Sequence, residues 1–312
     1  MLDGHSQLAV MVESHLFGIY KSVADQLGDR FRERSAELAE KMTTSRPLSY
    51  LEPKLDVKRI KHRRIATYAD LARAFLETWA EQRGKRIWVE KTPVHTLHWH
   101  YLREGFPQAK FVAVIRDPRP TALSLVRARF GPSAISDATR RWSSYVDAID
   151  ALTRAAPDQV HVVRYESLLA EPEAALTDLC RFVGLEFEDS LLSLRPRVKV
   201  VTDPVNRRNL QGELIRSNIA AWRKSMPAYQ QRICASLARP WNNWFDLDIE
   251  DAAMGTQDRL LDWVDKAKLV VKKARDRQGQ AERLDHAKLL LWARICRQLP
   301  SFPQMWSLNF PG

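Results

Sequence analysis

The stretch KFVAVIRDPRPTALS, residues 110–124, is the most informative part of the sequence about the fold. Residues 111–115 form a short, continuous apolar run rich in β-branched and aromatic side chains, which is typical of a buried strand. Pro118 suits the first turn of a helix, so we predict a helix near 119–129. The stretch therefore predicts a strand, a turn and a helix in close succession.

The same order of elements occurs twice more in the chain. We expect strands over 86–90 and 160–164, followed by helices near 94–104 and from about 172 to 183. Buried apolar strands that alternate with helices are typical of a parallel sheet covered on both faces. Between the second and third strands, residues 136–156 carry apolar side chains at helical spacing and predict a crossover helix. The predicted fold class is therefore α/β, with a parallel sheet flanked by helices.

Composition narrows the class of protein before any motif is considered. The 312 residues have a net charge of +11, which favours an anionic partner. With 45% hydrophobic and 28% charged residues the chain is globular, and its apolar runs are far shorter than a membrane-spanning helix needs. The cysteines Cys180, Cys234 and Cys296 are widely spaced and odd in number, which argues against a disulfide framework or a structural zinc site. A cytoplasmic location fits this pattern best.

Two regions differ from the alternating pattern. Residues 46–64 combine two prolines with a basic run, and we interpret them as a surface loop and lid that leads into a helix. After about residue 250 the strand signal stops, and two amphipathic helices are predicted near 260–274 and 284–299. We therefore expect a main domain over 1–250 and a C-terminal helical extension over 251–312.

Polar and charged residues follow the strand at 111–115. Ligands of parallel sheets bind at the carboxyl ends of the strands, where helix N-termini favour anions. Arg116 is placed to bind a phosphate with its planar guanidinium, and the hydroxyl of Ser124 could contact the same anion. Alternatively, Arg116 forms a surface ion pair with Asp117, and Ser124 is an ordinary helix residue without a ligand.

These residues carry a resemblance to a known family. The stretch 111–124, preceded by VEKTP (89–93) and followed by VRYESL (163–168) and Glu171-Pro172, resembles the sulfotransferase family in its bacterial and tyrosylprotein branch. The resemblance covers about residues 1–225. It implies a P-loop nucleotide-kinase-like fold and transfer of a sulfuryl group from 3′-phosphoadenosine 5′-phosphosulfate to a hydroxyl or amine. It implies no metal.

The resemblance also implies roles for individual residues. Arg116 and Ser124 match the residues that bind the 3′-phosphate of the donor. Lys91 matches the lysine that neutralises charge on the bridging oxygen as the donor splits. Negative charge develops on that oxygen during transfer, and a positioned cation stabilises it. Alternatively, Lys91 only forms a surface pair with its neighbour Glu90. Glu13, in MVESHLF (11–17), matches the general base on the acceptor, which partial burial would favour. His15 is the second candidate for the base.

Three further residues are candidates for donor contacts. Tyr165 resembles the aromatic side chain near the adenine, although a core or rim tyrosine is the alternative. In RSNIAAWR (216–223), Arg216 or Ser217 resembles the late family segment that closes over the nucleotide. By contrast, we expect no metal site at the three histidines His95, His98 and His100. They do not share one helical face, and no carboxylate nearby completes a set of metal ligands.

The sequence departs from the family in one respect. The family normally begins with a strand and a loop of the type Pro-Arg-Ser-Gly-Thr-Thr, whose backbone N–H groups hold the 5′-phosphosulfate. Here MLDGHSQLAV (1–10) instead resembles the helix after that loop. We therefore expect either that Met1 is an internal methionine or that the chain is a fragment; the alternative is a true truncation that is weak or inactive as an enzyme.

Two other classes of function suit parts of the sequence. The net charge and the basic run suit a non-catalytic anion- or nucleotide-binding protein, but the basic residues are interspersed with acids and no nucleic-acid motif is present, so we expect no nucleic-acid partner. A P-loop nucleotide kinase lacks its Gly-Lys-Ser/Thr loop here. The acceptor, whether a small molecule, carbohydrate, lipid or peptide, stays open, as do the oligomeric state and the role of 251–312.

Overall fold

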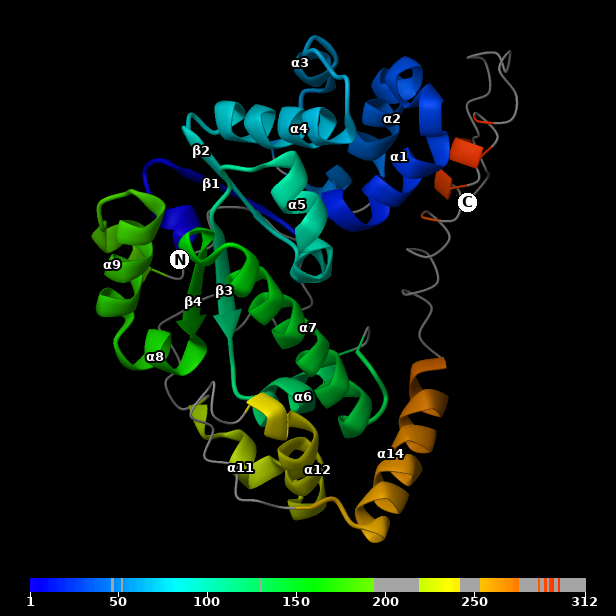
Figure 1. Ribbon diagram of the computed structural model, residues 1–312, viewed down its shortest axis with the longest axis vertical. Helices are drawn as coiled ribbons and strands as arrows, with labels where there is room; N and C mark the ends of the chain where they lie inside the picture. The colour runs from blue at the N-terminus through cyan, green and yellow to red at the C-terminus, as the bar shows by residue number, and fades with distance from the viewer. Residues whose placement is uncertain are drawn as a thin grey trace. The chain divides into compact units, whose positions relative to one another are not determined.

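The computed structural model describes residues 1–45, 48–51, 53–128, 131–193, 219–241 and 253–274, and, nearer the C-terminus, 286, 289–290, 292–294 and 297 (Figure 1). These residues divide into two compact units. One unit takes in residues 1–6 and the described residues from 96 to 274, and the other takes in residues 7–95 and the described residues from 286 onward. The domain boundary at residue 250 stays a prediction.

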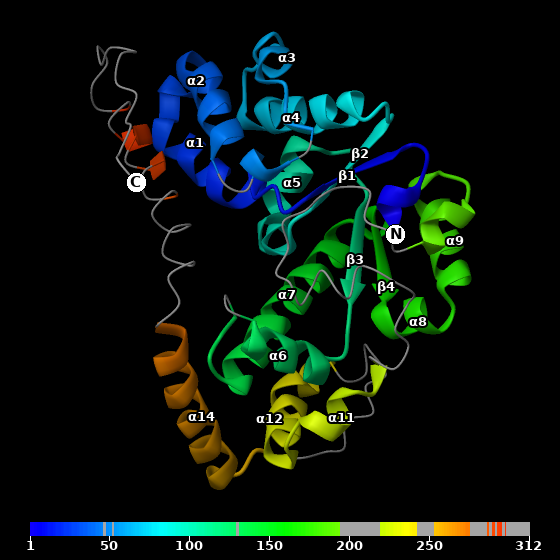
Figure 2. The same cartoon turned by 180° about the vertical axis from the view of Figure 1, so that it is seen from behind.

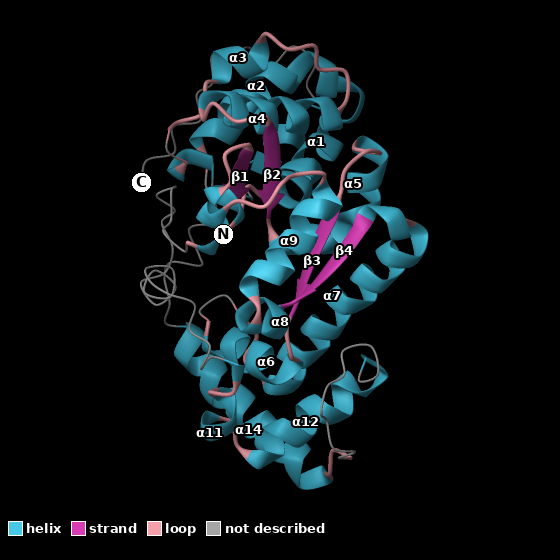
Figure 3. Ribbon diagram, turned by 90° about the vertical axis from the view of Figure 1, so that its left-hand side faces the viewer, coloured by secondary structure: helices cyan, strands magenta, loops and turns pink. Residues whose placement is uncertain are grey.

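The unit that contains residues 7–95 is built on two parallel strands. Strand β1 (Leu8–Val12) pairs with β2 (Ile87–Lys91), with Leu8 opposite Ile87 and Val12 opposite Lys91 (Figure 3). Helix α4 (Tyr68–Gln82) packs against both strands. Its Trp79 is fully buried, and the indole Nε1–H donates to the carbonyl oxygen of Val10 at 3.1 Å. Helix and sheet are thus joined by apolar packing and a buried hydrogen bond.

The other helices of this unit pack against one another and against α4. They are a π-helical turn η2 (Leu16–Tyr20), α1 (Lys21–Leu27), α2 (Phe31–Thr44) and α3 (Val57–Lys61), with short 3₁₀ turns η3 (Gly28–Arg30) and η4 (Leu48–Tyr50). A capping box between Thr67 and Asp70 begins α4, and the carboxylate of Asp56 caps α3. The described part of the predicted loop and lid at 46–64 is therefore partly helical, and Ile60 buries its side chain against the unit.

The other unit has its own pair of parallel strands. Strand β3 (Phe111–Ile115) pairs with β4 (Val160–Arg164), so that Ile115 lies opposite Arg164. Helix α7 (Ile135–Ala155) crosses between them and packs Trp142 and Val146 against Ile115 on one face of the sheet. At the other end of α7, residues of α5 (Trp99–Gly105) and β3 complete the apolar layer. Burial of these side chains is the main force that holds the crossover on the sheet.

The described part of this unit has further helices, of which α6 (Pro118–Arg127) and α8 (Tyr165–Ala170) begin at the ends of β3 and β4. The others are α9 (Pro172–Val183), α11 (Trp222–Ser225), α12 (Ala228–Ala238) and α14 (Thr256–Ala274), with 3₁₀ turns η1 (Leu2–Gly4), η5 (Pro93–His98, which leads in from the other unit), η6 (Pro157–Gln159), η7 (Asp189–Leu192) and η9 (Arg239–Trp241). Helices α6, α7 and α12 share one apolar cluster that includes Val126, Ala138 and Ile233. Helix α14 lies beside α12 (Figure 2).

Most of the predicted architecture is confirmed. The α/β class, the three predicted strands and the crossover helix are all present. The expectation that 1–10 belongs to a helix is wrong beyond Gly4, because Leu8–Val12 form strand β1. A run of five apolar residues fits a strand or a buried helix equally well, and pairing with β2 decides between them.

Two local expectations also need adjustment. The segment predicted as a helix near 94–104 begins with the 3₁₀ turn η5 before α5 follows. Strand β3 is less covered than predicted, because the side chain of Val114 is 57% exposed. In the described part of the chain, no helix combines the length and the apolar character that crossing a bilayer requires.

Candidate active site

The two predicted catalytic residues lie together at the carboxyl ends of β1 and β2. Glu13 follows β1 directly, and Lys91 is the last residue of β2. The Lys91 Nζ lies 3.0 Å from the Glu13 Oε1, and the backbone N–H of Glu13 donates to the carbonyl oxygen of Lys91 at 2.6 Å. Both side chains are about half exposed, so the partial burial expected of Glu13 is not observed. The structure thus presents an accessible carboxylate and ammonium at one strand edge.

The backbone around Glu13 adopts an unusual conformation. Glu13 has φ 53° and His15 has φ 54°, and these are the positive-φ residues other than glycine in the described chain. Left-handed backbone in non-glycine residues disfavours folding by about 1–3 kcal/mol each and persists only where surrounding contacts enforce it. Between the two, Ser14 is buried. With these two left-handed residues on either side, the side chain of Ser14 points inward and that of Glu13 is exposed.

A buried polar network beneath this turn supplies the enforcing contacts. Glu90 accepts hydrogen bonds from the hydroxyls of Ser14 at 2.6 Å and Thr92 at 2.5 Å through its Oε1. Its Oε2 lies 2.6 Å from the His95 Nδ1, and both of these side chains are more than nine-tenths buried. The Thr92 hydroxyl also accepts from the backbone N–H of His15 at 3.2 Å. Glu90 thereby ties the turn after β1 to the turn after β2.

The hydrogen bonds of His95 identify its tautomer. The backbone N–H of Phe17 donates to the His95 Nε2 at 3.0 Å, so this nitrogen is an acceptor. The ring proton therefore resides on Nδ1 and is donated to Glu90. This arrangement leaves a neutral imidazole on a carboxylate and uses both ring nitrogens.

Burial affects the titration of Glu90 and of nearby Tyr68. Burial by itself raises the pKa of Glu90, but hydrogen bonds from His95, Ser14 and Thr92 outweigh it and hold the pKa below its usual 4.5. Burial is also the main reason that the pKa of Tyr68 is well above its usual value, with further contributions from neighbouring acidic groups. The Tyr68 hydroxyl accordingly stays protonated and donates to the carbonyl oxygen of Leu16 at 2.5 Å. The network is held by a carboxylate acceptor and neutral donors.

A second pair of predicted residues lies at the carboxyl ends of β3 and β4. Arg116 follows β3, and Tyr165 begins α8 directly after β4. The guanidinium carbon of Arg116 lies 4.5 Å from the centroid of the Tyr165 ring. Such stacking fixes the orientation of a guanidinium. The structure thus brings together two of the predicted donor contacts.

The loop after β3 is held by a cap and by a second stacked arginine. The carboxylate of Asp117 caps α6 by accepting from the backbone N–H of Arg119 at 2.8 Å. The same carboxylate binds the Arg119 guanidinium at 2.6 Å and 3.1 Å. Arg119 in turn lies 4.4 Å from the ring of Trp222, which is buried. Glu166 accepts the backbone N–H of Asp117 at 3.1 Å, which joins this loop to α8.

Other predicted contacts are less well supported by position. Ser124 is exposed on α6, about 9 Å along the helix axis from Pro118 at a rise of 1.5 Å per residue. Arg216 and Ser217 lie outside the described residues. Within the family-like segment that contains them, only Ile219 to Arg223 are described.

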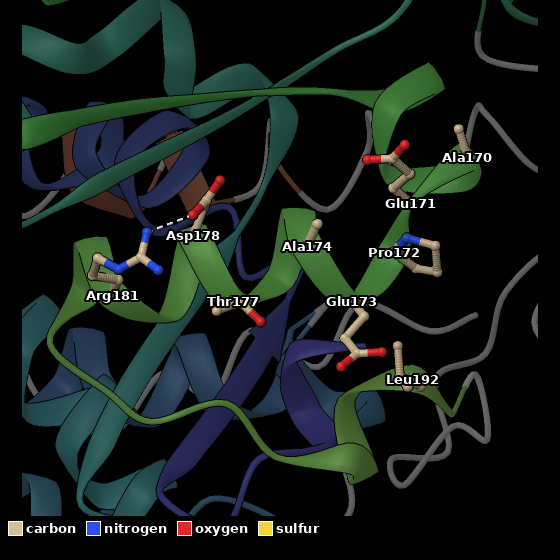
Figure 4. Close-up of a pocket in the computed structure, with 9 residues that line it drawn as sticks. All are labelled: Ala170, Glu171, Pro172, Glu173, Ala174, Thr177, Asp178, Arg181 and Leu192. Carbon is tan, nitrogen blue, oxygen red and sulfur yellow. Dashed lines mark hydrogen bonds and ion pairs between the residues drawn. The ribbon is translucent and has the colours of Figure 1, made fainter.

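The described chain also has an open surface hollow, which contains none of the predicted site residues. Its lining is acidic at three positions, and Arg181 there binds Asp178 at 2.6 Å (Figure 4). The lining residues are Ala170, Glu171, Pro172, Glu173, Ala174, Thr177, Asp178, Arg181 and Leu192. Because acidic side chains repel an anionic ligand, this hollow is a poor match for a phosphorylated donor.

The three histidines have other roles than binding a metal. His95 is occupied by Glu90 and Phe17, the His98 ring is stacked with Tyr101, and the His100 ring is stacked on Trp99. Among the residues that the structure describes, no group of three potential ligands could hold a metal ion.

Sequence reasoning missed the support beneath the turns. Glu90 was considered only as a surface neighbour of Lys91, and His95 only as a metal ligand. The signal that could have found them is the spacing in EKTPVH (90–95): the proline turn brings a residue five positions on back toward the strand end. In the structure this turn brings the His95 Nδ1 to within 2.6 Å of the Glu90 Oε2.

Comparison with known proteins identifies the family. The profile described as "Sulfotransferase family" matches residues 1–189. The chain is 30% identical over 165 residues to omega-hydroxy-beta-dihydromenaquinone-9 sulfotransferase of Mycobacterium tuberculosis (48% of this chain, 42% of the relative). It is 30% identical over 97 residues to protein-tyrosine sulfotransferase 1 of Danio rerio (30% of this chain, 27% of the relative). The chain thus spans less than half the length of these curated relatives.

Among solved structures, the sulfotransferase domain of the Synechococcus PCC 7002 olefin synthase aligns with 88% of this chain and 98% of its own, at 19% identity and a TM-score of 0.44. The profile match extends over more than half of the chain and includes both strand-end pairs, Glu13 with Lys91 and Arg116 with Tyr165. The chain belongs to the sulfotransferase family.

Proposed function

We propose that the protein transfers a sulfuryl group from 3′-phosphoadenosine 5′-phosphosulfate to a hydroxyl group of its acceptor. The observation that carries this proposal is the pair formed by Glu13 and Lys91, 3.0 Å apart and accessible at the ends of neighbouring parallel strands. A general base and a cation for the leaving group are the two functions that the reaction needs.

The roles follow from the chemistry of the transfer. Glu13 accepts the proton of the acceptor hydroxyl, whose oxygen attacks the sulfur in line with the leaving group. The bond between the sulfur and the bridging oxygen breaks, and the Lys91 ammonium stabilises the negative charge that develops on the nucleotide phosphate. Before substrates bind, Lys91 and Glu13 neutralise each other. Competition of the donor for Lys91 would then release the carboxylate to act as the base.

Donor recognition is assigned to the second pair. The guanidinium of Arg116 presents a planar set of donors suited to the 3′-phosphate, and the ring of Tyr165 beneath it fixes its orientation. Ser124 is proposed as an additional hydroxyl contact, and Arg216 or Ser217 as a further one. A hydroxyl acceptor is supported by the relatives, whose names specify an omega-hydroxy menaquinone and protein tyrosine. A cytoplasmic location stays part of the proposal.

Binding provides a test that does not require the acceptor. The protein should bind 3′-phosphoadenosine 5′-phosphate well and ADP poorly in calorimetric titrations, because only the former carries the phosphate assigned to Arg116. Equal affinity for both ligands would contradict that assignment. Transfer is then measured with a radiolabelled donor against a panel of phenols, lipid alcohols and tyrosine peptides. Tight nucleotide binding without transfer to any of them would favour the alternative, an inactive nucleotide-binding homologue.

The structure also bears on the nucleic-acid alternative. Of the described basic side chains near 54–64, Lys61 lies 2.6 Å from Glu40, and Arg63 is paired with both Glu77 and Glu81. This pairing reduces the net positive charge that part of the basic run presents to a phosphate backbone. This pairing favours the enzyme over a nucleic-acid binding protein.

A further inference from the structure

Helix α14 is oriented with its acidic side toward the protein. Asp258 and Asp262 are buried, and Asp265 is partly buried. Asp258 binds the Arg232 guanidinium at 2.6 Å, and Asp262 accepts hydrogen bonds from Ser136. The remaining carboxylate, that of Asp265, accepts from the hydroxyl of Tyr229. All three acidic residues of α14 are thus used to attach the helix to α7 and α12.

The opposite side of α14 is apolar and exposed. Trp263 is 66% exposed, Leu260 60% and Val270 51%, and Ala267 between them is exposed as well. These four residues recur at spacings of three and four, so they form one outward face (the α14 outer face). Amphipathic helices of globular proteins normally turn such a stripe toward the core. The reversal indicates that this face serves an interaction.

Charge identifies the kind of partner. Arg259 and Lys268 are exposed and border the α14 outer face on its two sides, at the angular positions that 3.6 residues per turn assigns to them. Because the aspartates face inward, the outward half of the helix has no acidic side chain, as far as its side chains are described, and it carries the neutral polar residues Thr256 and Gln257 beside the apolar and basic ones. An exposed tryptophan with leucine on an apolar face and basic residues at its edges is typical of helices that lie in a membrane interface.

We propose that the α14 outer face binds the surface of an anionic lipid bilayer, with the helix parallel to the membrane plane. Leu260 and Trp263 insert at the level of the headgroups, and Arg259 and Lys268 contact lipid phosphates. A symmetric contact with a second copy suits the face less well, because it would place the same basic edges near each other. The proposal concerns binding alone and does not depend on the assigned catalytic roles.

The experiment is co-sedimentation of the full chain with vesicles of phosphatidylcholine alone or mixed with phosphatidylglycerol. We expect binding to the mixed vesicles that weakens as salt is raised. The double variant Leu260→Ser/Trp263→Ser should reduce the partition coefficient at least about tenfold. Arg259→Gln and Lys268→Gln should each reduce it roughly fivefold.

Two matched controls remove exposed side chains of the same kinds elsewhere. Tyr101→Ser acts on α5, where Tyr101 is 45% exposed, and Arg181→Gln acts on α9, where the side chain is 73% exposed. Both controls should bind as the unaltered protein does, and circular dichroism should show that every variant is folded. Absence of binding to the mixed vesicles, or an equal loss with the controls, would overturn the proposal. Unchanged vesicle binding with dissociation of a dimer in the double variant would assign the face to a second copy instead.

Discussion

The two strand-end pairs differ in how the protein holds them. Glu13 and Lys91 form an exposed ion pair on a strained turn, and a buried network of Glu90, His95, Ser14 and Thr92 enforces that turn. Arg116 instead rests on the face of Tyr165, next to a loop fixed by a helix cap. The positions of Glu13 and Lys91, which are assigned to the transfer step, thus depend on backbone geometry. The orientation of Arg116, which is assigned to donor binding, depends on contact with an aromatic ring. Variants at the two pairs should therefore affect different measurements.

The largest effect is expected for Glu13→Gln. Removal of the proposed base should reduce kcat about 10²–10⁴-fold while the affinity for 3′-phosphoadenosine 5′-phosphate is unchanged, since the amide keeps the shape of the side chain. Steady-state kinetics and calorimetry measure the two quantities. Glu33→Gln, which alters an exposed carboxylate near Arg30, serves as the control. Retained turnover in Glu13→Gln would remove Glu13 as the base and leave His15 as the candidate.

A somewhat smaller loss of turnover is expected for Lys91→Met. Without the ammonium, charge on the leaving phosphate is not stabilised, and kcat should fall about 10²–10³-fold. Lys91→Arg should recover part of this loss because it keeps the charge. Lys61→Met removes a comparable lysine that is paired with Glu40, and it should leave kcat as it is. A similar fall in both methionine variants would mean that the effect is one of net charge.

Substitution of Arg116 tests the binding side of the comparison. Arg116→Ala should weaken binding of 3′-phosphoadenosine 5′-phosphate by about 1.5–3 kcal/mol, the range for hydrogen bonds to a charged group. Arg116→Lys should restore this only in part, since lysine lacks the planar fork. Arg154→Ala, at an exposed arginine paired with Asp150, is the control. If the alanine variant at 116 changes kcat and leaves affinity intact, the division of roles between the two pairs is wrong.

The buried network should determine stability and its dependence on acid. The pKa of Glu90 is below 4.5 in the folded protein, so its carboxylate stabilises the fold above that pH, and this contribution is lost as the pH falls through the folded value. Glu90→Gln should therefore lower the free energy of unfolding by about 1–3 kcal/mol at neutral pH and flatten its decline in acid. Denaturant unfolding at a series of pH values, from neutral pH down into acid, measures the loss of stability and its dependence on pH. Equal acid sensitivity of the two proteins would show that Glu90 does not make this contribution.

The smallest effect is expected at Tyr165. Tyr165→Phe keeps the ring under Arg116 and should alter donor affinity little, whereas Tyr165→Ala should weaken it by about 0.5–1 kcal/mol, the range for an exposed cation–π contact. Titrations with 3′-phosphoadenosine 5′-phosphate measure the difference. An equal loss with phenylalanine and with alanine would mean that the hydroxyl, and not the ring, contributes to binding.

Local patterns along the chain were sufficient for several features. The apolar runs that precede Lys91, Arg116 and Tyr165 identified three strands correctly, because a continuous stretch of β-branched and aromatic residues bounded by turns has few other solutions. Residues that follow parallel strands lie at the carboxyl ends of those strands, so the sequence could also place Lys91 at the end of β2, and Arg116 with Tyr165 at the ends of β3 and β4. The α/β class and the family followed from the same segments.

Only the tertiary structure decided how those segments meet. The pairing of Val12 with Lys91 joins residues far apart in sequence, and the register that places Glu13 beside Lys91 is a nonlocal choice among strands of similar composition. The same holds for Glu90 and His95, whose burial depends on Ser14 and Phe17 from another turn. The outward direction of the apolar face of α14 depends on Arg232 and Tyr229, which bind its aspartates. Sequence periodicity shows that a helix has two faces, and the neighbouring side chains determine which face is buried.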